Sequence, residues 1–149
     1  MYLSDSMTVR FPDTWLHDVI DTWSLIVAES AADAARHASG EQIRSLQHLL
    51  AELAAQSAPE LWQSVAAATY FGIGEASGNR VFERLVYDLW QVLSQSGRHW
   101  DLGARLWPIR LEVEQSLQAV VAGIAGAGPD LARAAMESHI RGVFGAADA

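Results

Sequence analysis

The sequence contains no cysteine, and its ten basic residues other than histidine are all arginine. The absence of cysteine excludes disulfides, thiol nucleophiles and thiolate metal sites. No stretch approaches the roughly 18 uninterrupted apolar residues that a membrane-spanning helix needs. The first residues, Met1 to Asp13, lack the basic start and apolar run of a signal peptide. We therefore expect a soluble, cytoplasmic protein.

Positive charge is also scarce, since the formal net charge is -8 at pH 7. The arginines are scattered along the chain, whereas binding to nucleic-acid phosphates needs a clustered basic face. We therefore expect that this chain does not itself bind DNA, and that any contact with DNA is made through other residues.

The chain does have enough apolar residues for a core. Half of its 149 residues are hydrophobic, which argues against disorder and fits one domain. Apolar residues recur at helical spacing, and alternating strand-like runs are nearly absent. The sequence predicts an all-α fold, a single-domain antiparallel bundle of about six helices. Residues 1–13 form a lead-in segment, and residues 14–149 form the domain.

Start and stop signals divide the chain into these helices. The first runs from about Thr14 to His37, and Ser39 with Gln42 has capping-box spacing for the second. The signals for the later helices are Pro59 in the first turn of the third, Ser77-Gly78 at its end, Asn79 as the N-cap of the fourth, a loop from Gly97 to Gly103, a fifth start between Ala104 and Ile109, and Pro129 opening the sixth.

No pair of residues in the sequence is typical of catalysis. There is no His-Glu-x-x-His motif, no Gly-x-Ser-x-Gly elbow and no phosphate-binding loop. The acidic pairs Asp18/Asp21 and Glu112/Glu114 are interpreted as surface charge. His139 lies on the apolar stripe of the last helix, where a lone histidine is more often a satisfied core residue than a ligand. We expect that the protein is not an enzyme.

Aromatic and small residues indicate a possible binding cavity. The chain has six tryptophans, and core packing explains most of them. A bundle with aromatic and small residues on its inner faces can also enclose an apolar cavity. Tyr87, Trp90, Trp107 and the small residues of the third helix are candidates for its lining. Arg98-His99 could meet an anionic head group or could neutralise the C-terminus of the fourth helix.

Two glycines, Gly72 and Gly74, lie inside the third helix, where each costs roughly 1 kcal/mol relative to alanine. Such positions usually allow another helix or a ligand to approach closely.

Three phrases resemble the FCD effector domains of the FadR subfamily of GntR transcription regulators. The first is Tyr70–Asn79, which ends in Ala-Ser-Gly-Asn as the family phrase does. The second is Gly123–His139, with a small-residue turn, an Ala-Arg-Ala-Ala-Met run and a closing histidine. The third is Ala34–Ser39, followed by Leu46. The resemblance covers nearly the whole chain from about Leu16. It implies an effector-sensing and dimerisation domain.

Many FCD domains bind a metal ion through an aspartate and three histidines. By resemblance these ligands fall on Ala68, Gly72, about Leu117, and His139. A single imidazole cannot hold a divalent ion tightly, so we expect no metal and no other cofactor. Members of the family commonly carry an arginine near the middle of the first helix. At about that position this sequence has Trp23 instead.

The replacement of polar ligands by Ala, Gly and Leu implies an apolar effector. The fatty-acid-responsive branch of the family is similarly metal-free, and Gly97–Trp100 resembles a stretch of that branch. The resemblance thus implies a fatty acyl-CoA or fatty acid, bound near Ala68, Gly72, Leu117 and His139. The alternatives are a ligand-free structural dimerisation module and a metal-dependent sensor of a small organic acid.

The family places a winged helix-turn-helix before this domain, and the resemblance implies a homodimer. Met1–Asp13 is too short for such a DNA-binding domain. An excised domain and a natural loss of the DNA reader both remain open. In either case we expect DNA contact only through a separate domain, and no contact with a membrane.

Overall fold

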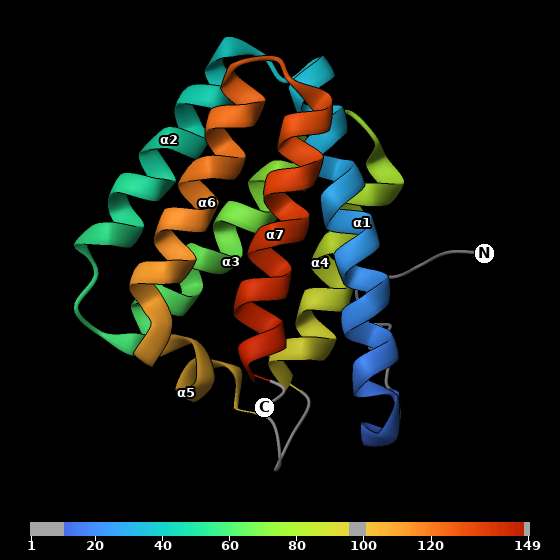
Figure 1. Ribbon diagram of the computed structural model, residues 1–149, viewed down its shortest axis with the longest axis vertical. Coiled ribbons are helices and arrows are strands. Elements are labelled where there is room, and N and C mark those ends of the chain that lie inside the picture. Colours follow the sequence, from blue (N-terminus) through green and yellow to red (C-terminus); the bar gives the residue numbers. More distant parts are fainter. Residues whose placement is uncertain (1–10, 96–100, 148–149) are drawn as a thin grey trace.

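The computed structural model describes residues 11–95 and 101–147, and every regular element in these ranges is helical (Figure 1). The α-helices are α1 (Leu16–His37), α2 (Gly40–Ala55), α3 (Pro59–Ala76), α4 (Arg80–Gln95), α5 (Leu102–Leu106), α6 (Arg110–Ala125) and α7 (Pro129–Ala147), with the short 3-10 helices η1 (Asp13–Trp15) and η3 (Trp107–Ile109). The predicted all-α bundle is confirmed, with six long helices and one short one.

Local signals set most helix boundaries where the sequence places them. The Ser39 hydroxyl accepts a hydrogen bond from the Gln42 N–H, and the Gln42 side chain accepts one from the Ser39 N–H, which is the predicted capping box. Gly78 adopts a φ of 73° at the turn after α3, a conformation that favours glycine. Oδ1 of Asn79 then accepts from the N–H groups of Val81 and Phe82, both at 3.0 Å.

The residues that lead into α6, from Asp101 on, differ from the prediction. A loop was expected to continue to Gly103, but α5 begins at Leu102 because the Asp101 carboxylate accepts a hydrogen bond from the Ala104 N–H at 3.0 Å. Leu102 and Leu106, the first and last residues of this short helix, are both buried in the core. Proline cannot donate the hydrogen bond that would continue an α-helix, so Pro108 in η3 separates α5 from α6.

Helix α1 contacts α3, α4, α6 and α7. In Figure 1, α7 lies between α6 and α1 at the front, with α3 behind it. Small residues bring the helices close: a Cβ atom on Gly123 of α6 would lie 3.0 Å from the backbone of Ala132 in α7. None of the described helices is long and apolar enough to cross a membrane.

Candidate functional site

His139 of α7 lies at the centre of a buried hydrogen-bonded chain. Its Nε2 atom is 2.6 Å from the Tyr70 hydroxyl of α3, and its Nδ1 atom is 2.5 Å from the Ser116 hydroxyl of α6. Ser116 Oγ also lies 2.8 Å from the carbonyl oxygen of Glu112, to which it donates. This donation makes Ser116 the acceptor for Nδ1–H, so the Tyr70 O–H donates to Nε2. Both ring nitrogens are therefore satisfied.

Burial keeps the side chains of His139 and Tyr70 uncharged at neutral pH. It lowers the pKa of His139 to about 4, because an imidazolium ion in the core would lose its hydration. Burial likewise raises the pKa of Tyr70 well above its usual range. Neutral imidazole and neutral phenol each keep one donor, which is what the hydrogen-bond chain needs. The side chains of Tyr70, His139 and Ser116 thus form a hydrogen-bonded polar network inside an apolar core.

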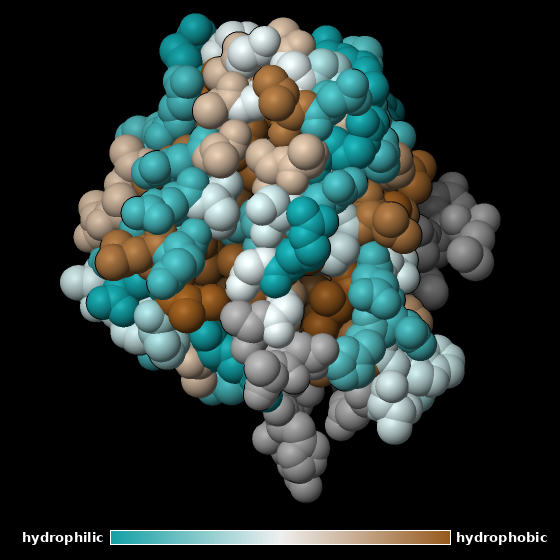
Figure 2. Space-filling model, viewed as in Figure 1, coloured by the Kyte–Doolittle hydropathy of each residue, from teal (hydrophilic) through white to brown (hydrophobic). Residues whose placement is uncertain are grey.

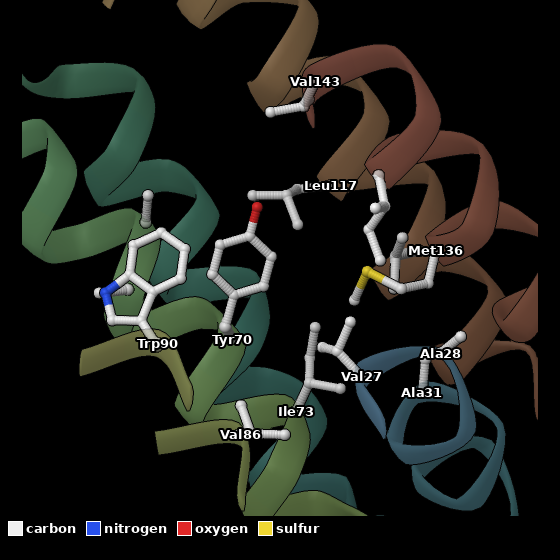
Figure 3. Close-up of a cluster of buried hydrophobic side chains, with 14 of the residues drawn as sticks. Val27, Ala28, Ala31, Tyr70, Ile73, Val86, Trp90, Leu117, Met136 and Val143 are labelled. Carbon is white, nitrogen blue, oxygen red and sulfur yellow. The ribbon is translucent and has the colours of Figure 1, made fainter. Parts of the chain in front are cut away.

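The donor set around His139 does not fit a metal ion. Both imidazole nitrogens are occupied by hydrogen bonds, and the side chains buried in one cluster with Tyr70 in Figure 3, among them Leu117 and Met136, are hydrophobic and offer no hard ligand. Within residues 11–95 and 101–147, no group of three or more His, Cys, Asp or Glu residues could hold a metal ion. The position is built as a packed hydrogen-bond network.

Tyr70 and Ser116 were not singled out in the sequence. The periodicity of α3 does indicate that Tyr70 is buried. It belongs to a series with spacings of four and three residues, all of them buried: Trp62, Ala66, Tyr70 and Ile73. The resemblance phrase drew attention to Phe71-Gly72, two positions that face elsewhere. Ser116 gave no comparable signal, since a serine within a helix commonly bonds only to its own backbone.

Trp23 of α1 is a fully buried tryptophan of the core. Its ring packs edge-on against Tyr70, with centroids 4.9 Å apart, and against Phe144 at 5.3 Å. Trp90 lies 5.6 Å from it. The indole Nε1–H of Trp23 is buried and has no hydrogen-bond partner. An unsatisfied buried donor costs roughly 1–3 kcal/mol, so this atom is unusual in a folded core.

The residues predicted to line one cavity do not come together. Trp90, Leu117 and His139 are buried in the core. Ala68 and Gly72 instead line a groove between α2 and α3, and a Cβ atom on Gly72 would lie 2.9 Å from the Leu46 side chain. The close approach that this glycine permits is therefore with helix α2.

Tyr87 and Trp107, which were also predicted to line the cavity, have other surroundings. Tyr87 is exposed on α4 and packs against Phe71 with the two rings tilted and their centroids 5.0 Å apart. Trp107 packs on Trp62 and under the Arg110 guanidinium. Arg98 and His99 lie outside the described residues.

A groove of about 510 Å³ runs between α1 and α7. Its floor is apolar, and its rim carries charged groups of both signs. We call the apolar lining residues Ile20, Leu25, Ala28, Ile140 and Phe144 the floor, and the lining residues His17, Asp21, Glu137 and Arg141 the rim. We call this hollow the α1–α7 groove. Figure 2 views this face, where hydrophobic side chains reach the surface among hydrophilic ones.

An ion pair joins α1 and α7 beyond one end of the groove. The Arg133 guanidinium of α7 donates to both carboxylate oxygens of Glu29 in α1, at 2.7 and 3.2 Å. This hydrogen bonding lowers the pKa of Glu29. Because the two helices are antiparallel, the pair lies beyond the Ala28 end of the groove, and Phe144 lies toward the other end. The groove is thus fixed at one end and depends on the last turns of α7 at the other.

Comparison with known proteins identifies the fold's family. The family model described as the FCD domain matches residues 18–142, which cover all or most of every long helix of the bundle. None of the curated proteins matches this chain. The chain therefore belongs to the FCD domain family, the effector-binding domain of GntR-type transcription regulators.

Proposed function

We propose that this domain senses a fatty acyl-CoA or a fatty acid without a metal ion, as in the FadR subfamily. The observation that carries the proposal is the α1–α7 groove, with an apolar floor of five side chains and Arg141 on its rim. The acyl chain would lie on the floor, and the anionic end would lie near Arg141. Asp21 and Glu137 on the same rim oppose an anion, so the acyl chain must supply most of the affinity.

The energetics of burial favour a ligand with a long chain. Each buried methylene contributes about 0.8 kcal/mol, so ten contribute about 8 kcal/mol before the cost of association. Micromolar affinity corresponds to about 8.2 kcal/mol. A groove of about 510 Å³ is within the size range of small-molecule sites. A chain of about a dozen carbons thus suits the space, and contacts of the head group must add to its burial to offset the cost of association and reach micromolar affinity.

A ligand-free structural dimerisation module is the second candidate. The observation in its favour is the filled centre of the bundle, where Trp23, Tyr70 and Trp90 pack against one another. A filled core has no internal site for an effector to bind. A metal-dependent sensor of a small organic acid, the third candidate, would have to break the Tyr70–His139 hydrogen bond before Nε2 of His139 could serve as a single ligand.

We also propose that the domain forms a homodimer in the cytoplasm and that DNA is contacted only through a separate domain. Ligand binding would shift the bundle between two packings and so change the spacing of the DNA-binding heads. Light scattering of the purified chain tests the dimer, and a monomer at micromolar concentration would contradict it.

Thermal unfolding with and without dodecanoyl-CoA tests the effector class. A ligand at a hundred times its Kd adds about 2.7 kcal/mol, which shifts Tm by several degrees. We expect this shift with dodecanoyl-CoA in the presence of a chelator, and none with a divalent metal plus a dicarboxylate. A shift only in the second sample would establish the metal-dependent sensor. No shift in either sample would favour the structural module.

A further inference from the structure

We propose that Trp23 is a buried hydrogen-bonding subsite for a neutral carbonyl oxygen of the effector, reached from the α1–α7 groove past Phe144. This inference rests on the proposed function, because it assigns a polar contact to the apolar ligand of that groove. It is carried by the unpartnered indole Nε1–H, which lies within the bundle where no acceptor reaches it.

The chemistry of the Trp23 surroundings selects the acceptor. The ring neighbours of the indole are Tyr70, Trp90 and Phe144, and none of them presents an acceptor to Nε1. Tyr70 uses its hydroxyl to donate to His139. A carboxylate placed among these rings would lose its hydration without gaining a counter-ion, which costs several kcal/mol. A ketone, ester or thioester oxygen is neutral and needs only the one donor that Trp23 offers.

Phe144 connects this buried donor to the surface. It lines the α1–α7 groove and packs edge-on against Trp23, and it is the ring contact of Trp23 that also belongs to the groove. Displacement of this one ring would place the groove and the indole in a single space. An acyl chain on the groove floor could then turn its carbonyl group inward.

The local sequence makes displacement of Phe144 inexpensive. Phe144 lies in the last turns of α7, between Gly142 and Gly145. A Cβ atom on either glycine would meet nothing within 4 Å, so close packing does not explain their presence. Two glycines without a packing role weaken the end of a helix by roughly 1 kcal/mol each relative to alanine. Local opening of this turn therefore requires less free energy than opening of the α7 centre.

Three ligands of equal chain length test the subsite: methyl nonyl ketone, undecane and undecanoate. Heteronuclear NMR of protein with isotope-labelled tryptophan nitrogen resolves the indole N–H groups, and a Trp23→Phe variant assigns the one from Trp23. We expect saturation with the ketone to move the Trp23 indole proton downfield, as a new hydrogen bond does. Undecane, which has no acceptor, and undecanoate, whose charge opposes burial among these rings, should produce no such downfield shift. A Trp23 signal that stays in place with bound ketone would overturn the subsite.

Affinity gives a second, independent readout. Loss of one neutral hydrogen bond should weaken ketone binding by about two- to tenfold in Trp23→Phe, with undecane binding nearly unchanged. Equal losses for both ligands would mean that the indole contributes only packing, which contradicts the subsite and leaves the effector proposal standing. If none of the three ligands binds the natural sequence, the apolar-effector proposal itself fails. The spectra of the natural sequence keep the test decisive if Trp23→Phe does not fold.

Discussion

The hydroxyl oxygen of Tyr70 lies 2.6 Å from Nε2 of His139, although 69 residues separate them in the chain. This contact joins α3 to α7, and Ser116 extends it to α6. The position that the family resemblance assigns to a metal ligand is thus used here to connect three helices of the core. The consequences for stability can be measured without knowledge of the effector.

Tyr70→Phe should destabilise the fold by about 1–3 kcal/mol, because it leaves the Nε2 acceptor of His139 buried without a donor. Chemical denaturation at pH 7 measures the change. Tyr87→Phe is the matched control, since the Tyr87 side chain is exposed, and its effect should stay within about 0.5 kcal/mol. Equal effects of the two substitutions would show that the Tyr70–His139 bond does not stabilise the core.

Stability should fall as the pH drops from about 6.5 to about 4. The pKa of His139 is about 4 in the folded protein and near 6.5 in an unfolded chain, so in this window only the unfolded state binds the proton. The loss from this group amounts to about 3 kcal/mol. Denaturation across the window should show a shallower slope for His139→Gln, whose amide can keep both hydrogen bonds. A slope identical to that of the natural sequence would refute the assignment.

Glu114 should matter more than its neighbour Glu112. Its Oε1 atom accepts a hydrogen bond from Nε1 of the fully buried Trp62 at 2.9 Å, so Glu114→Ala leaves that donor unsatisfied. We expect a loss of about 1–3 kcal/mol in chemical denaturation, and less than about 0.5 kcal/mol for the exposed Glu112→Ala. Glu114→Gln, which keeps an acceptor, should recover most of the loss. Failure of Glu114→Gln to do so would point to a role other than this hydrogen bond.

Two glycine substitutions should change the stability of the fold in opposite directions. Gly123→Ala would place a Cβ atom 3.0 Å from the backbone of Ala132, forcing α6 and α7 apart at a cost of about 1–3 kcal/mol. Gly142→Ala meets nothing within 4 Å on an exposed face of α7 and should stabilise the helix by up to about 1 kcal/mol. Thermal unfolding of both variants checks the pair. Destabilisation by Gly142→Ala would show that this glycine has a structural role.

Much of the fold could be predicted from the sequence because its signals are local. The capping box at Ser39 and Gln42 and the proline at the start of α3 act within a single turn. The same kind of signal, Asp101 before Leu102, marks the start of α5, but a helix of five residues is too short to show an apolar periodicity in the sequence. Glu114 was interpreted as surface charge, since its partner Trp62 is 52 residues away.

The site was harder to predict because it depends on which helices face one another. Gly72 and Tyr70 are two positions apart on α3, yet Gly72 lies against α2 and Tyr70 against His139. A family phrase carried over by order along the chain cannot fix that rotation. The α1–α7 groove joins Ile20 to Ile140 across the sequence and has no motif at all.

Calorimetric titration of the chain with dodecanoyl-CoA, in the presence of a chelator, tests the central claim most directly. Two matched variants locate the site: Leu25→Glu on the groove floor and Leu111→Glu on α6, both at exposed leucines. We predict micromolar binding to the natural sequence, about tenfold weaker binding to Leu25→Glu and unchanged binding to Leu111→Glu. Absence of binding without metal, or equal affinity for the two variants, would contradict a metal-free acyl effector in the α1–α7 groove.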